Sequence, residues 1–147
     1  MWKIISKAIV LAALGATAAW ADGTPISKEA RVYIIWPRDG QTISGGKMWV
    51  RMGLKNAGVA PAGVEKVNTG HHHLIVDAPL PPLNQEIPSD KHHLHFGAGQ
   101  TEVQLELPPG KHTLQLLLAD HQHTPHNPPV YSERITIIIP ERTAKGP

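Results

Sequence analysis

The residues of this sequence that are most able to do chemistry are its histidines, because the chain has ten of them and no cysteine. In three places two histidines have the spacing His-x-His, and one more histidine follows shortly after the third pair. In an extended strand, alternate side chains point to the same side about 6.6 Å apart, so each pair can direct two imidazoles at one ion. We therefore predict a metal site with ligands among His71, His73, His93, His95, His121, His123 and His126.

The donor types indicate which ion such a site would hold. Without cysteine the chain cannot form a disulfide, a thiolate zinc site, an iron–sulfur cluster or a blue-copper centre. With imidazole ligands, the Irving–Williams order makes copper(II) the tightest-binding ion, so we expect copper first and zinc second. Met48 and Met52 could offer thioethers to copper(I). They share a face with Val50 and Leu54, however, which favours a place in the core.

Three other histidines have structural interpretations. His72 shares strand parity with Leu74 and Val76, so we expect it to be buried with them. His112 follows a Pro-Gly turn and shares a face with leucines, which predicts a corner residue that is hydrogen-bonded to the backbone. For His92 we expect a solvated position on the surface.

The N-terminus resembles a secretory signal. Lys3 and Lys7 precede an apolar run, and Ala19-Trp20-Ala21 has the small-x-small pattern of a cleavage site. The apolar run has about eleven residues, too few for the roughly 20 of a spanning helix. We therefore expect export, cleavage before Asp22, a periplasmic or secreted location, and no membrane span after cleavage.

The remaining chain is expected to be one all-β domain, an immunoglobulin-like β-sandwich of about seven strands. Short runs with an apolar and polar alternation are separated by Pro- and Gly-rich turns, and no segment has a convincing helical period. The predicted organisation is a signal peptide over 1–21, a lead-in over 22–30, the sandwich over 31–140 and a C-terminal tail over 141–147. The expected strands are 31–36, 47–54, 71–77, 91–96, 101–107, 111–119 and 130–139.

The charge pattern excludes several partners and activities. Without Lys3 and Lys7 the basic and acidic residues balance, and the rest of the chain has no run of lysine or arginine, so we expect no nucleic-acid partner. The sequence contains neither a G-x-S-x-G hydrolase motif nor a G-x-x-x-x-G-K-[ST] phosphate loop.

Four segments carry a resemblance to a known family: HHHLIVD, HLHFGAGQTE, LPPGKHTLQLLLAD and HxxPHxPPVYSE, the last of which starts at His121. With them the chain resembles the bacterial exported family catalogued as domain of unknown function 4399, from about Tyr33 to Ile139. The resemblance implies a single exported domain with histidine-rich segments, and it implies no activity. The histidines that match the pattern of the family are His71, His73, His95, His112, His123 and His126.

The function predicted from these features is an exported, histidine-rich metal-binding protein for copper storage, delivery or tolerance. Its expected partners are the metal ion and another exported metal-handling protein. Two alternatives remain open at this point: a mononuclear metalloenzyme with a histidine-ligated metal, and a metal-free interaction module of the cell envelope. The sequence does not fix the oligomeric state.

Overall fold

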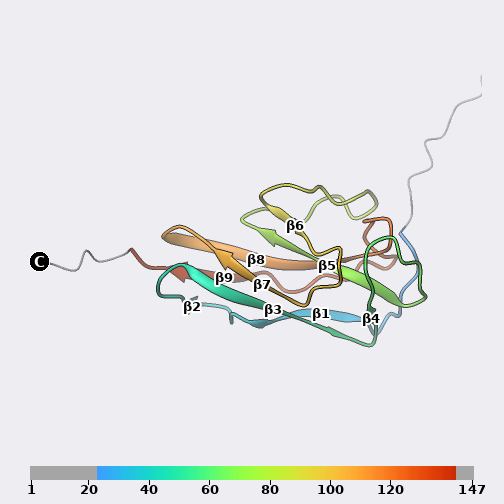
Figure 1. The fold of residues 1–147 in the computed structure, drawn as a ribbon, viewed down its shortest axis with the longest axis horizontal. Helices are drawn as coiled ribbons and strands as arrows, with labels where there is room; N and C mark the ends of the chain where they lie inside the picture. Colours follow the sequence, from blue (N-terminus) through green and yellow to red (C-terminus); the bar gives the residue numbers. More distant parts are fainter. Residues whose placement is uncertain (1–22, 142–147) are drawn as a thin grey trace, which may run out of the picture.

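The computed structural model describes residues 23–141, which form two stacked β-sheets (Figure 1). One sheet has the order β1-β3-β7 and the other β2-β9-β8-β5-β4, with β6 paired to β5. This confirms the prediction of an all-β, immunoglobulin-like β-sandwich. None of the described residues forms a helix that is long and apolar enough to cross a membrane. The strands are β1 (Arg31–Trp36), β2 (Gln41–Thr42), β3 (Lys47–Lys55), β4 (Gly58–Val59), β5 (Thr69–Val76), β6 (His93–His95), β7 (Glu102–Glu106), β8 (Gly110–Ala119) and β9 (Ile135–Ile139).

Most strands lie where the alternation predicts them, with two kinds of difference. The last strand begins at Ile135 instead of Val130. The segment before it still contacts β8, but as an isolated bridge, because the Ser132 hydroxyl accepts a hydrogen bond from the Leu116 N–H and donates to the Glu133 carbonyl. The two-residue strands β2 and β4 pair in parallel with β9 and β5, and such short segments have no periodicity to detect.

The predicted signal peptide lies outside the described residues, as does the chain beyond residue 141. The described part of the lead-in packs against the domain. Ile26 and Ala30 are buried in the main core, and Pro25 forms a bridge with Asn127.

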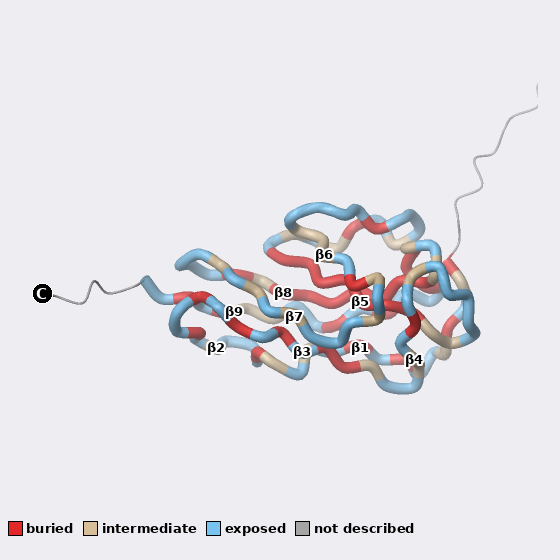
Figure 2. Tube along the Cα trace, in the orientation of Figure 1, coloured by how far each residue is buried: buried red, intermediate tan, exposed pale blue. Residues whose placement is uncertain are grey.

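The main core lies between the two sheets (Figure 2). Strand β3 contributes Met48, Val50 and Met52 to it, as their alternation predicts. Strand β8 contributes Leu114, Leu116 and Leu118. The burial of these side chains supplies the main stabilisation of a domain of this size.

A second, smaller core covers the outer face of the six-stranded sheet. Its centre is Ile75 of β5 with Leu117 and Ala119 of β8, and Ile87 closes over them. Ile87 belongs to the proline-rich loop between β5 and β6, which arches over these strands in Figure 1. Because both faces of the sheet are covered here, every residue from Gly70 to Val76 is buried. Even-numbered side chains of β5 therefore face the main core, and odd-numbered ones face the loop.

Candidate metal centre

The site begins with His71 and His73 on the outer face of β5. They share that face with Ile75, and their side chains are almost completely buried, with 0% and 1% of their surface exposed. Their Nε2 atoms lie 3.1 Å apart. The strand alternation directs both imidazoles to one place, as the His-x-His spacing predicts.

The third imidazole comes from β6, which pairs with β5 so that His95 lies opposite His73. The His95 ring centroid is 5.0 Å from that of His71 and 5.0 Å from that of His73. The close approach depends on Gly97, because a Cβ atom at that position would lie 2.6 Å from His95 Nε2. No ordinary Cβ contact is that short, so the ring occupies space that only glycine leaves free.

The fourth imidazole is His123, in the loop after β8. The Asp120 carboxylate shapes this loop by accepting hydrogen bonds from the backbone N–H groups of Gln122 and Thr124. His123 has a φ of 64°, a left-handed conformation, and its carbonyl accepts a hydrogen bond from the Ile87 N–H at 2.9 Å. The proline-rich loop and the turn at Asp120 together place the His123 ring next to the other three.

The four histidines 71, 73, 95 and 123 are called the histidine cluster below. Ring nitrogens of His71, His95 and His123 all lie within 4.8 Å of one another. Two imidazoles on one tetrahedral ion have ligand nitrogens about 3.3 Å apart and ring centroids about 5 Å apart. Five of the six centroid distances in the cluster lie between 4.7 and 5.2 Å, and the sixth, from His73 to His123, is 6.3 Å. The rings of His71, His95 and His123 are therefore spaced as ligands of a common ion are, and the His73 ring lies next to this group.

The electrostatics of the cluster keep its buried rings neutral. Burial, with the neighbouring imidazoles as a further cause, lowers the pKa of His71 to about 4 and that of His73 to about 2. Burial and His123 also lower the pKa of His95. The Nδ1 atoms of His71 and His73 are buried without a hydrogen-bond partner among the described residues. Neutral imidazole is the form that binds a metal, so the cluster needs little or no deprotonation at these two positions at neutral pH.

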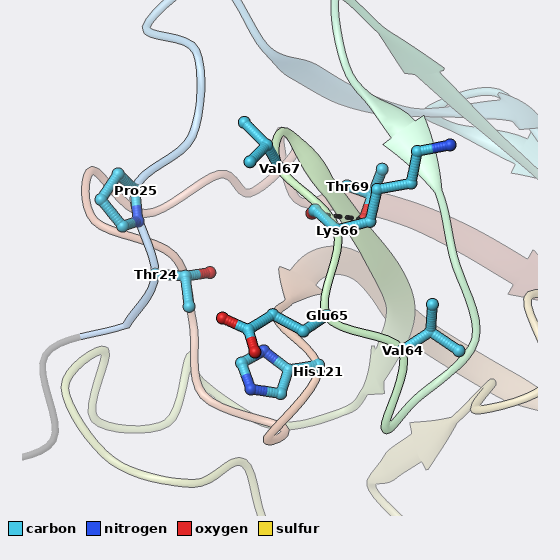
Figure 3. A pocket seen from close by; sticks show the side chains of 8 residues that line it. All are labelled: Thr24, Pro25, Val64, Glu65, Lys66, Val67, Thr69 and His121. Atoms are coloured by element: carbon cyan, nitrogen blue, oxygen red, sulfur yellow. Dashed lines mark hydrogen bonds between the residues drawn. The ribbon is translucent and has the colours of Figure 1, made fainter.

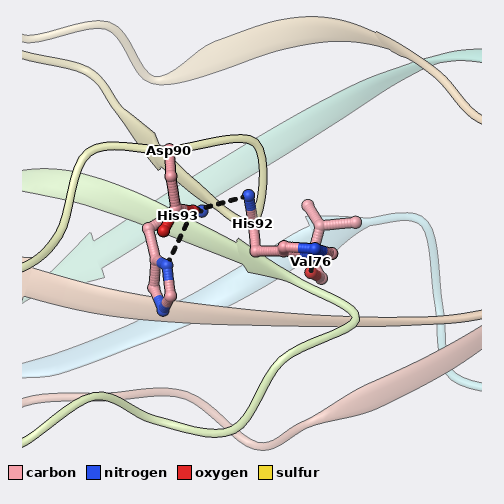
Figure 4. A network of polar contacts seen from close by, with 4 residues as sticks. All are labelled: Val76, Asp90, His92 and His93. Atoms are coloured by element: carbon pink, nitrogen blue, oxygen red, sulfur yellow. Dashed lines mark hydrogen bonds and ion pairs between the residues drawn. The ribbon is translucent and has the colours of Figure 1, made fainter.

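His93 does not join the cluster, although it belongs to the second pair. Its Nδ1 atom lies 2.9 Å from the Asp90 carboxylate, which also accepts hydrogen bonds from the backbone N–H groups of His92 and His93 (Figure 4). The His92 ring contacts the carbonyl of Val76 through Nδ1 at 2.8 Å. The hydrogen bonds of the turn at Asp90 thus hold the His93 ring apart from His95.

The other two predicted ligands also lie elsewhere. His121 lines a separate surface cavity of about 280 Å³ together with Thr24 and Glu65 (Figure 3). The buried His126 ring contacts the hydroxyl and the carbonyl of Thr24 through Nδ1, and burial lowers its pKa. Neither residue belongs to the group of ring nitrogens that could share an ion.

His72 and His112 are buried as their structural interpretations predict, whereas His92 is half-buried, with its ring against the Val76 carbonyl, and is not the solvated surface residue expected. His72 is completely buried on the face of β5 that points into the main core. His112 is mostly buried, and its two ring nitrogens contact the Asp77 carboxylate at 2.6 Å and the Pro108 carbonyl at 2.9 Å. Burial acts to lower the pKa of His112, but the hydrogen bond to Asp77 outweighs it and the pKa is raised.

The sequence did not indicate which histidine of each pair would join the cluster. Only His95 of the second pair and His123 of the third pair do so. Two features of the sequence are consistent with this selection. Gly97, two residues after His95, leaves room for the His95 ring to lie against it. Asp120 organises the turn that contains His123. Both features are local, and the His-x-His spacing alone does not take them into account.

One of three comparisons with known proteins, the scan against family models, identifies the family. A search of curated proteins finds no match. Among solved structures, the PKD domain (residues 329–428) of human KIAA0319 is similar at 8% identity and a TM-score of 0.36, over 90% of this chain and 95% of that one. The family model described as "Domain of unknown function (DUF4399)" matches residues 50–140, from within β3 to the end of β9. The chain belongs to this family, domain of unknown function 4399, as its histidine-bearing segments indicate.

Proposed function

We propose that this protein is an exported metal-binding protein that holds one copper ion at the histidine cluster, for copper storage, delivery or tolerance. The observation that carries the proposal is the convergence of three imidazoles, those of His71 on β5, His95 on β6 and His123 in the loop after β8, whose ring nitrogens lie within 4.8 Å of one another. The His73 ring lies beside them. These segments lie far apart in the sequence, so their meeting is a property of the fold.

The two buried rings of the cluster have nitrogens that coordination of an ion would satisfy. A buried polar atom without a partner costs about 1–3 kcal/mol, and the Nδ1 atoms of His71 and His73 are two such atoms. Histidines outside the cluster differ in this respect: His112 has both ring nitrogens bonded to oxygen, whereas those of His72 and Nε2 of His126 are also buried without a partner among the described residues. The cluster has no oxygen partners of this kind, and an ion coordinated by its imidazoles would compensate for part of that cost.

The donor set favours copper. In the described part of the chain, the group that could hold an ion consists only of histidines. The nearby Asp120 carboxylate already accepts hydrogen bonds from three backbone N–H groups, those of Thr24, Gln122 and Thr124. Nitrogen donors without carboxylates select copper(II), then zinc, over calcium, magnesium or manganese. An exported protein meets copper outside the reach of cytosolic buffers.

A copper titration tests the proposal. The purified protein, titrated with Cu²⁺ near pH 7.5, is expected to bind one equivalent with a dissociation constant below about 1 μM. The double variant His71→Ala/His73→Ala should lose that equivalent. The variant His121→Ala is the matched control, because this histidine lies in the same loop as His123 but outside the cluster, and it should bind as the unaltered protein does. Millimolar affinity, or equal binding by the double variant, would contradict the proposal.

Export is tested separately. The full-length chain, expressed in a bacterial host and recovered from the periplasm, is expected to begin at Asp22 when its N-terminus is sequenced. A product that keeps residues 1–21 and stays in the cytoplasm would remove the proposal of export and leave the metal site untouched.

A mononuclear metalloenzyme is the second candidate, because His95 is exposed and His123 partly exposed, and catalytic metal sites keep an open position. The metal-loaded protein would then bind a small anion such as azide directly to the ion, with a new charge-transfer band, and would also turn over a substrate. Anion binding without turnover of any tested substrate would favour the binding protein.

A further inference from the structure

The four members of the histidine cluster differ sharply in their access to solvent. His71 and His73 are buried under the proline-rich loop, His123 is partly exposed, and His95 is exposed. The side of the cluster that faces solvent is thus the side of His95. An ion held here would be shielded from solvent on the side of β5 and accessible on the side of His95.

His95 is held by a short strand. It ends β6, which has three residues and pairs with β5. No hydrogen bond joins its ring to another described side chain or carbonyl, whereas the neighbouring His93 ring is tied to Asp90. The ring lies against Gly97, which has no side chain to hold it in place. The His95 ring can therefore rotate into solvent without unpacking the core.

These features distinguish the ligands by how they can exchange. A metal passes between two sites most easily when an incoming donor binds before all the original ligands have left. The buried rings of β5 offer no path for such a donor, and the place of His95 does. An exposed imidazole at the rim is suited to leave first, because its departure exposes no apolar surface.

We propose that copper enters and leaves the histidine cluster by exchange at His95, so that a nitrogen or thioether donor of a second molecule replaces this imidazole while His71 and His123 retain the ion. One bond forms between the metal and the incoming nitrogen or sulfur atom and the metal–nitrogen bond to His95 breaks, with no change in the oxidation state. The second molecule would be a metal-handling protein that presents an exposed imidazole or methionine. This inference rests on the proposed function, since it requires that the cluster binds copper.

Chemical rescue by free imidazole tests the exchange. His95→Ala, loaded with one equivalent of Cu²⁺, should show a shifted visible absorption band and altered electron paramagnetic resonance parameters. Millimolar free imidazole should restore both, because the place of His95 is open to solvent. In His71→Ala, loaded in the same way, imidazole should restore neither, because that place is closed. Circular dichroism of each variant checks that the sandwich is folded.

A rate measurement on the unaltered protein tests the same inference without a variant. Copper removal by EDTA should accelerate in proportion to the EDTA concentration, as attack at an open side requires. A rate independent of EDTA, or equal rescue of the two variants by imidazole, would overturn the inference while leaving copper binding intact. If the unaltered protein binds no copper at all, the proposed function itself fails, and the two failures are thereby distinguished.

Discussion

The lowered pKa of the buried cluster histidines predicts an unusual resistance of copper binding to acid. Three imidazole ligands with the ordinary pKa of about 6.5 would together weaken binding about 1,000-fold between pH 7.5 and 5.5, since each is about 90% protonated at the lower pH. His71 has a pKa of about 4, and it stays almost wholly neutral over this range. Removing its contribution limits the expected weakening to at most about 100-fold.

The assay is a competition titration of Cu²⁺ against a chelator whose own pH dependence is known, at several pH values between about 7.5 and 5.5. The imidazole C–H signals of the metal-free protein, followed by NMR over the same range, report whether His71 and His73 remain neutral. A weakening of about 1,000-fold or more, or titration of these signals near pH 6.5, would refute the reasoning, because it would mean that burial does not suppress protonation of the cluster.

Three further predictions follow from individual contacts. Since the folded-state pKa of His71 is depressed from 6.5 to about 4, its contribution to stability is present above pH 6.5 and is lost as the pH falls toward 4. In urea titrations of the metal-free protein, the free energy of unfolding should fall over this range, and the fall should be smaller in His71→Leu by up to about 3 kcal/mol, which is the contribution of His71 alone. Gly97→Ala should displace the His95 ring and weaken copper binding at least several-fold in the same competition titration, with an unchanged melting temperature; unchanged affinity would contradict the contact. Asp77→Ala should lower the free energy of unfolding by about 1–3 kcal/mol in urea, because it leaves His112 without its carboxylate partner, whereas Asp77→Asn, which keeps an acceptor and tolerates the φ of 53°, should cost less.

The strands of the sandwich could be predicted from the sequence because each has two environments that alternate. Met48, Val50 and Met52 face the core with polar residues between them, and the predicted strand at that place is confirmed. The predicted start of the last strand was wrong. Val130–Tyr131 is apolar enough to belong to a strand, but the Ser132 hydroxyl binds the neighbouring backbone and interrupts the ladder. That hydrogen bond depends on the position of β8, which no local pattern contains.

The metal centre was predictable in its donor type and in the pair on β5, and not in its full membership. Strand parity places His71 and His73 on one side whatever the rest of the chain does. Which ring of the second pair turns inward depends on Asp90, whose carboxylate holds His93. The part of the third pair that reaches the cluster depends on the left-handed backbone at His123. These are properties of turns, where spacing carries little information.

The alternation along β5 also makes the strand intolerant of changes in length. Odd positions carry His71 and His73 while even positions carry Leu74 and Val76, so the same strand supplies both the proposed metal ligands and part of the core. If the pairing with β8 stayed fixed, deleting or inserting a single residue before His71 would move every following side chain of β5 to the opposite face of the sheet. His71 and His73 would then face the main core, and Leu74 would face the proline-rich loop. A deletion or insertion of one residue here is therefore expected to disrupt the histidine cluster and the main core together.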